Sequence, residues 1–341
     1  MPVINTFGQS NESVNISKIL TFAQKYGPDM FREFMNDSEF ATHFPIYNGV
    51  VNEMGFMKIS TDGMLGPYTG KIENDGGEFT YSQRKLTVKV GQANLAFDPE
   101  TIRPTVRANQ IVTSLTSLKQ VPDQALLLGE FMRRLQAGLN DNTFYKGDTS
   151  LAVAPGNKVL RWADGLEKDL LACIAAGSDK YDGIVPATTA AWDAGSGDNA
   201  NFTSGNMIEG FEAVDDQFTG AAAKEDRTIF CAPHVFKKYN KDYKRRHKTN
   251  PTYEKFNGGR FGFVMMDDTN DKVKIASATW LGTSNRIIDV IDGSIVGGCD
   301  IPGMISSLDV QKIGFIFHFL CKSIFGVKIV NPEGVKTNTL A

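Results

Sequence analysis

Two stretches, GFMKIS at Gly55–Ser60 and RKLTVKV at Arg84–Val90, decide the fold class of this chain. Both consist of residues typical of strands, whereas residues 62–77 between them are rich in glycine and include one proline, which favours turns. No apolar pattern with a helical period interrupts residues 47–103. The sequence therefore predicts a long β-hairpin with an irregular tip.

An isolated two-stranded ribbon is only marginally stable in water, so its apolar face must be covered by another surface. We favour cover by a neighbouring subunit; the alternative is that the ribbon folds back onto its own sheet. The apolar face is expected to comprise Met57, Ile59, Leu86, Val88 and Val90. The residues predicted to contact another subunit are Met57, Ile59, Met64, Leu65, Tyr68, Lys71, Leu86 and Val88.

Composition places the chain among ordinary globular proteins with a sizeable core. It has 341 residues, of which 41% are hydrophobic and 22% charged. A net charge of -3 argues against wrapping nucleic acid by overall charge, so any such contact must be local. There is no apolar run of roughly 18 residues and no signal-peptide pattern, which favours an intracellular protein without a membrane partner.

Several helices are indicated by apolar periodicity and by their boundary residues. Short helices are expected near residues 16–23 and 29–35, and the clearest long helix runs from Asp123 to about Asn140. A further helix is expected from Asp164, with Glu167 completing a capping box, to Gly177. Another follows at residues 207–218.

The remaining segments predict an α/β unit and a strand-rich last third. RTIFCA at Arg227–Ala232 reads as a buried strand that leads into a basic helix, and residues 179–205 as a surface loop anchored by Trp192. Later strands are expected at Lys272–Ala276, Arg286–Ile291, Ile313–Leu320 and Ser323–Val330.

No pattern of residues predicts a catalytic, cofactor or metal site. GPYTGK at Gly66–Lys71 is one residue short of a phosphate loop, and Ile72 follows where Ser or Thr would hold magnesium. The four histidines show no metal-ligand spacing. The cysteines are expected to be reduced core thiols: Cys173, Cys231, Cys299 and Cys321.

One local electrostatic feature stands out, a basic run interleaved with Tyr239 and Tyr243. Three interpretations remain open: a solvated helix face, a contact to an acidic patch of an adjacent subunit, or a contact to packaged nucleic acid. The residues of this basic patch are Lys237, Lys238, Lys241, Lys244, Arg245, Arg246 and Lys248.

The order of elements resembles, over nearly the whole chain, the major capsid protein of tailed double-stranded-DNA bacteriophages. That fold is shared with encapsulin shells and with the floor of herpesvirus capsids. The stretches similar in character to this family are NTFYKGD (Asn142–Asp148), ADGL (Ala163–Leu166), RTIFCAPHVFKKY (Arg227–Tyr239) and FGVKIVNPEGV (Phe325–Val335). The family's occasional lysine–asparagine cross-link cannot be carried over, because no motif fixes which of Lys58, Lys71 and Asn331 would match.

The resemblance implies an α+β fold, the tailed-phage major capsid fold. Its parts would be an N-terminal arm (1–44), an extended β-hairpin loop (45–103), a peripheral domain with a long spine helix (104–150), an axial domain (151–305), and strands returning to the peripheral domain (306–341).

The resemblance also implies a non-enzymatic function. The chain would self-assemble into hexamers and pentamers of an icosahedral phage head that encloses double-stranded DNA, without a cofactor. Its partners would be copies of itself, a portal, scaffold or decoration proteins, and packaged DNA bound without sequence preference. It would reside in the virion after assembly in the bacterial cytoplasm. The alternatives are an encapsulin-like shell subunit or a soluble α/β enzyme with an unrecognised site.

Overall fold

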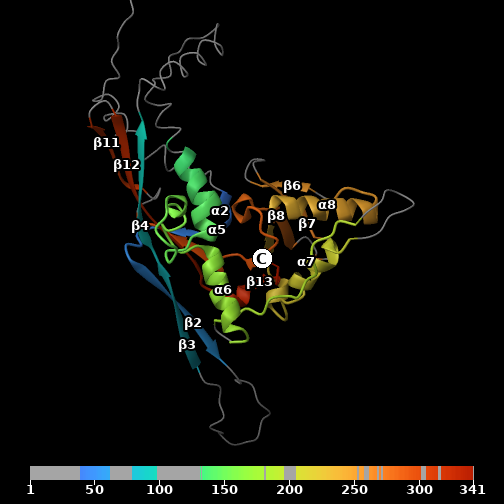
Figure 1. The fold of residues 1–341 in the computed structure, drawn as a ribbon. Coiled ribbons are helices and arrows are strands. Elements are labelled where there is room, and N and C mark those ends of the chain that lie inside the picture. Colours follow the sequence, from blue (N-terminus) through green and yellow to red (C-terminus); the bar gives the residue numbers. More distant parts are fainter. Residues whose placement is uncertain are drawn as a thin grey trace, which may run out of the picture.

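The structure is a computed structural model (Figure 1). It describes residues 39–61, 79–97, 131, 133–179, 182–195, 205–251, 253–256, 261–266, 269, 272–300, 305–313 and 316–340. Several predictions fall outside these residues: the helices near 16–23 and 29–35, most of the first half of the helix from Asp123, and the contact residues Met64, Leu65, Tyr68 and Lys71.

The described residues form two larger sheets and a two-stranded ribbon, with helices beside them, which confirms the α+β class. The five-stranded sheet has the order β1-β10-β12-β11 with β4 on the other edge of β12: Ile46–Tyr47, Ile295–Gly298, Ile316–Ile329, Ile305–Ile313 and Lys89–Phe97. The six-stranded sheet has the order β13-β9-β5-β8-β7-β6: Val335–Thr337, Ile287–Ile291, Arg227–Cys231, Val273–Ser277, Phe261–Met265 and Tyr253–Phe256.

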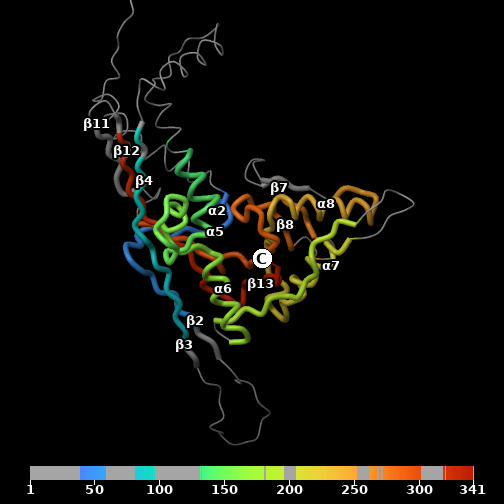
Figure 2. Tube along the Cα trace, in the orientation of Figure 1, coloured from blue at the N-terminus to red at the C-terminus, as the bar shows by residue number. Residues whose placement is uncertain are grey.

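The predicted hairpin strands are present as the ribbon, formed by β2 (Glu53–Thr61) and β3 (Phe79–Thr87) in continuous antiparallel register. After Val88 the chain enters β4, which leaves the ribbon and pairs with β12 over nine residues. Figure 2 shows the cyan β4 and the red β12 side by side along one edge of the molecule. The second ribbon strand is therefore continuous with the five-stranded sheet.

The long helix extends further than its sequence pattern indicated. Residues 131 and 133–138 are helical, and the helical backbone continues through the π-helix η1 (Leu139–Thr143) into α5 (Phe144–Lys146). The expected end near Asn140 is therefore wrong. Phe144 and Tyr145 are fully buried, which accounts for the additional turn because their burial keeps this segment against the core.

The helix expected from Asp164 is α6 (Leu166–Ala176), and it ends at Gly177 as predicted. The predicted capping box is wrong: the N-cap is Gly165, with no side-chain cap. The Asp164 carboxylate instead accepts hydrogen bonds from the backbone N–H of Thr149 at 2.9 Å and from the Lys168 ammonium at 2.8 Å.

The α/β unit is confirmed, since β5 leads directly into the basic helix α8 (Pro233–His247). The helix α7 (Met207–Asp215) matches the prediction at 207–218. Trp192 is buried and its indole N–H donates to the Asn285 carbonyl at 2.6 Å, so it anchors its loop as expected. All four cysteines are free and buried, as predicted.

The last third differs from the prediction in one respect. The strands expected at Ile313–Leu320 and Ser323–Val330 are a single strand, β12, and β11 precedes it as a hairpin partner that was not predicted. Strand β13 pairs with β9 in the six-stranded sheet. The segment after residue 306 thus contributes to both large sheets.

An aromatic cluster joins the helices to the six-stranded sheet. The short helix α2 (Glu39–His43) brings Phe40 onto Phe144 with ring centroids 4.7 Å apart. Phe44 and Phe144 both lie near Trp280, at 6.0 and 5.1 Å. Figure 1 shows α2, α5 and α6 between the β4–β12 edge and the six-stranded sheet. The ribbon extends from this core.

Candidate assembly surface

The base of the ribbon is fixed to the body of the same chain. The Arg84 guanidinium on β3 lies 2.7 Å from the Asp182 carboxylate and 3.3 Å from that of Asp169 on α6. Asp169 also pairs with Lys328 of β12 and accepts a hydrogen bond from the Ile329 backbone N–H at 2.8 Å. One carboxylate thus connects α6, β12 and the ribbon.

The two faces of the ribbon have different environments. Met54 pairs with Leu86, and Met57 pairs with Gln83, so Leu86 and Met57 lie on opposite faces because side chains alternate along a strand. Leu86 is 0% exposed and Val88 is also buried, whereas Met57 is 68% exposed. The single apolar face expected from the sequence is therefore wrong. Leu86 and Val88 are core residues of this chain, and the candidate surface excludes them.

The outward face of the ribbon carries exposed apolar side chains. Tyr81 is 64% exposed and lies in β3, paired with Ile59 of β2. Val90, at the start of β4, is likewise exposed. Lys85 and Glu53 form an exposed ion pair at 2.9 Å on the same part of the ribbon. Met57 and Tyr81 define the candidate contact surface of the ribbon.

A groove of about 790 Å³ lies where β4 passes the long helix. Its apolar lining comes from three segments, and it includes Val90, Phe131, Leu135, Leu139, Val159 and Trp162. Its charged lining residues are all basic: Arg134, Lys158 and Arg161. Within the described residues the groove thus combines apolar walls with positive charge, which suits an apolar segment that carries acidic residues.

Three residues of the basic patch have structural roles. Lys238 donates to the Trp192 carbonyl at 3.0 Å, and Arg245 donates to the Ala194 carbonyl at 2.6 Å. Arg246 binds both carboxylate oxygens of Glu209 at 2.6 Å. These side chains attach the loop after Trp192, and helix α7, to α8.

Asp242 completes that attachment, and the sequence pattern did not single it out. Its buried carboxylate accepts hydrogen bonds from the backbone N–H groups of Gly205 at 3.0 Å and Met207 at 3.1 Å. The donors are at the start of α7, where backbone N–H groups lack helical partners. The remaining four residues of the basic patch, Lys237, Lys241, Lys244 and Lys248, are exposed.

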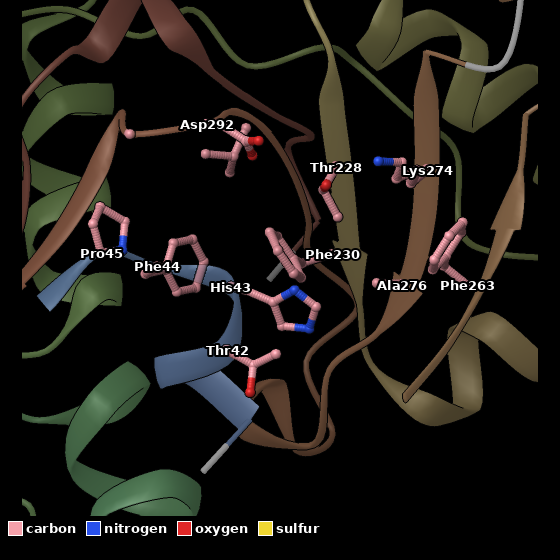
Figure 3. A pocket seen from close by; sticks show the side chains of 12 residues that line it. Thr42, His43, Phe44, Pro45, Thr228, Phe230, Phe263, Lys274, Ala276 and Asp292 are labelled. Atoms are coloured by element: carbon pink, nitrogen blue, oxygen red, sulfur yellow. The ribbon is translucent and has the colours of Figure 1, made fainter. Parts of the chain in front are cut away.

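A smaller cavity of about 360 Å³ separates α2 from the six-stranded sheet (Figure 3). His43 projects toward the sheet, with its ring 5.0 Å from that of Phe230. Burial lowers the pKa of His43 to about 4, so its imidazole is neutral at neutral pH. Thr228 and Lys274 line the sheet side of this cavity.

A buried charged cluster lies in the six-stranded sheet. Arg227 is 2.5 Å from the Asp215 carboxylate and 4.0 Å from that of Asp289, which is fully buried. Burial, and then the neighbouring Asp215 carboxylate, raise the pKa of Asp289 well above its ordinary value. Burial likewise raises the pKa of Asp215. The pair therefore favours retaining a proton.

The described part of the chain contains no group of three or more His, Cys, Asp or Glu residues placed to hold a metal ion. Among the same residues, no helix has the length and apolar character needed to cross a membrane.

Comparison with known proteins identifies structural relatives but no sequence relatives. No family model and no curated protein matches the chain. A chain of the satellite phage P4 procapsid, a structure that includes the size determination (Sid) protein, matches with a TM-score of 0.52 and 10% identity over 92% of this chain and 98% of that chain.

Two further solved structures are similar over comparable lengths. The capsid of Myoviridae phage XM1 gives a TM-score of 0.49 and 13% identity over 88% of this chain and 90% of that one. The SrpI encapsulin from Synechococcus elongatus PCC 7942 gives a TM-score of 0.47 and 10% identity over 97% of this chain and 91% of that one. The match to the P4 procapsid covers nearly all of both chains. The chain therefore has the tailed-phage major capsid fold.

Proposed function

We propose that this chain is a non-enzymatic shell subunit that self-assembles into hexamers and pentamers of an icosahedral phage head around double-stranded DNA. The observation that carries this proposal is the fold shared with a procapsid chain over 92% of this sequence and 98% of that chain. The projecting ribbon supports it, because Met57 and Tyr81 expose apolar surface that a neighbouring copy would cover.

The anchoring of the ribbon base suits it to this role. Arg84 and Asp169 fix β3 to α6, so the outward face is presented by a backbone that the body of the chain already orders. Ordering cost at an interface is lower when the contacting element is rigid before binding. A second copy would then need only to cover Met57 and Tyr81.

We further propose that the groove between β4 and the long helix receives the ribbon tip of a second copy. Residues 62–78 contain four acidic residues and one lysine, a net charge of -3, together with Met64, Leu65, Tyr68 and Ile72. The apolar and basic lining of the groove complements that composition.

The first experiment tests the ribbon contact. Purified wild-type protein should form closed particles by negative-stain microscopy and sediment as a large assembly. Met57→Glu combined with Tyr81→Glu should yield small oligomers with unchanged thermal stability, because both side chains are exposed in the single chain. The control is Val185→Glu, an exposed apolar residue that does not belong to the ribbon strands. A wild-type protein that stays monomeric under all assembly conditions contradicts the proposal.

The second experiment tests the groove by charge exchange. Lys158→Glu should impair assembly, and adding Glu73→Lys with Asp75→Lys in the same chain should restore it, since opposite charges would again face each other. Lys146→Glu changes an exposed lysine that does not line the groove and should assemble normally. Impairment without rescue would leave the shell role intact but exclude this occupant of the groove.

The remaining assignments follow from the same proposal. We keep the division into arm, extended loop, peripheral domain, axial domain and return strands (306–341), and β13 of this last part pairs with β9 in the six-stranded sheet. Portal, scaffold or decoration proteins would be further partners. The site of residence would be the virion capsid, after assembly in the bacterial cytoplasm.

A further inference from the structure

The exposed side of α8 carries three lysines in one line, and a fourth lysine follows at the C-cap. Lys237, Lys241 and Lys244 are spaced by four and three residues, so they fall within an arc of about 60° on the helix surface. Lys248 is the C-cap residue and has a left-handed backbone, with φ at 56°, so it lies just beyond the last helical turn. The opposite side of the helix holds the buried residues Val235, Tyr239 and Asp242. We call this set of four lysines the lysine stripe.

Within α8 the lysine stripe has no exposed acidic neighbour. Asp242 is the one acidic residue in α8, and it is fully buried, where it binds the start of α7. No lysine of the stripe makes a hydrogen bond or ion pair with another residue in the described part of the chain. Like charges three or four residues apart on a helix repel each other by about 0.2–0.5 kcal/mol per pair. The stripe therefore lowers helix stability slightly, and an external anion would relieve that repulsion.

The helix dipole accounts for only part of this arrangement. Lys244 and Lys248 lie at the C-terminal end of α8, where positive charge is favourable. Lys237 and Lys241 lie between the first and last turns of α8, where the dipole does not stabilise positive charge. The dipole thus gives no reason for the first two lysines of the stripe.

We propose that the lysine stripe binds the phosphate backbone of nucleic acid without reading its sequence. Lys237 and Lys244 are about 10 Å apart along the helix axis, a length over which duplex DNA presents several phosphates. Lys248 extends the stripe past the end of the helix. Lysine is a point-charge ligand for phosphate, whereas protein–protein interfaces are depleted in lysine and need apolar anchors. The stripe itself contains only lysines, so nucleic acid fits it better than an acidic protein segment.

This proposal differs from the shell proposal in its residues and in its test. Lys238, Arg245 and Arg246 belong to the same basic run but hold the fold together, so they are excluded from the binding surface. The chain as a whole has a net charge of -3, and the stripe is a local exception.

Fluorescence anisotropy with short labelled DNA duplexes of two unrelated sequences tests the proposal. Four phosphate contacts predict a slope of log affinity against log salt of about -3 to -4, which is about a 100-fold loss between about 50 and 200 mM salt. Both duplexes should bind equally. Replacing all four stripe lysines with glutamine should remove most of the slope, and each single replacement should reduce it by about 1.

The matched control replaces four exposed lysines elsewhere, Lys89, Lys146, Lys224 and Lys322, with glutamine and so changes net charge equally. It should retain the wild-type slope. Each variant is compared at the same assembly state, established by size-exclusion chromatography. Equal losses in both quadruple variants, or wild-type binding by the stripe variant, would refute the assignment. So would binding of a poly-glutamate peptide together with failure to bind either duplex, which would assign the stripe to an acidic protein partner.

Discussion

Arg84 of the ribbon and Asp169 of α6 form an ion pair, with 3.3 Å between the guanidinium and the carboxylate, and their side chains are only 12% and 10% exposed. The two residues belong to elements that are far apart in the sequence, and Asp169 also contacts β12 through Lys328. The pair thus determines how the ribbon leaves the body of the chain.

Arg84→Gln should lower the free energy of unfolding by about 3 kcal/mol, because it leaves the largely buried Asp169 without one of its partners. Urea denaturation followed by circular dichroism measures this change. Lys85→Gln, one residue along, removes an exposed pair with Glu53 and should cost less than about 1 kcal/mol. Similar costs for both variants would mean that the Arg84 pair does not hold the ribbon base.

Gly326→Ala should destabilise the chain by about 1–3 kcal/mol. A Cβ at Gly326 would lie 2.4 Å from the backbone carbonyl oxygen of Thr87, at the point where the ribbon strand passes into β4. Gly156→Ala is the control, since a Cβ there would meet no atom within 4 Å. Thermal unfolding should separate the two variants clearly; an unchanged midpoint for Gly326→Ala would show that β4 can shift without cost.

His43 should contribute to acid instability. Its pKa is about 4 in the folded chain, below its ordinary value of about 6.5, because burial disfavours the charged imidazole. The unfolded chain therefore binds more protons between these values. The stabilising contribution is complete above about pH 6.5 and is lost as the pH falls through about 4, a total of about 3 kcal/mol.

His43→Gln should reduce the loss of stability between pH 6.5 and pH 4 that urea titrations at each pH record. His247→Gln, which changes an exposed histidine, is the control. Parallel profiles for wild type and His43→Gln would show that the imidazole is not shielded from water.

The contribution of Asp289 to stability should depend on pH with the opposite sign from that of His43. Because burial and Asp215 raise the pKa of Asp289, the folded chain holds a proton that the unfolded chain releases. This stabilising contribution is complete below the ordinary aspartate pKa near 4 and is lost as the pH rises through the raised value. Asp289→Asn should therefore gain stability relative to wild type between pH 5 and pH 9. The exposed Asp226→Asn is the control, and a constant difference for Asp289→Asn across this range would contradict the shared-proton arrangement.

The secondary structure was largely predictable where the signal is local. GFMKIS lies in the first ribbon strand, RKLTVKV spans the end of β3 and the start of β4, and Gly177 ends α6, because strand composition and a positive φ at glycine depend on neighbouring residues. The prediction of a single apolar face on the ribbon was wrong because the face on which each side chain lies depends on the register between the two strands. That register pairs Met57 with Gln83, and nothing within either strand specifies it.

The contacts that anchor the base of the ribbon could not be predicted from the sequence, because their partners lie far apart along the chain. Arg84 reaches Asp169 and Asp182 across 85 and 98 residues of chain. The two strands predicted for this region left a gap at Cys321–Lys322, whereas β12 runs through both residues. In the structure Ser323 is buried, and the strand continues through it because β4 and β11 pair with it from both sides.

The continuity of β3 with β4 has a mechanical consequence. A pull on the ribbon along its length is transmitted to β4. The hydrogen bonds between β4 and β12 lie across the direction of the force. All nine residue pairs then resist the load together rather than opening one after another. Tension between connected copies would thus be borne in shear by the paired strands β4 and β12 of each molecule.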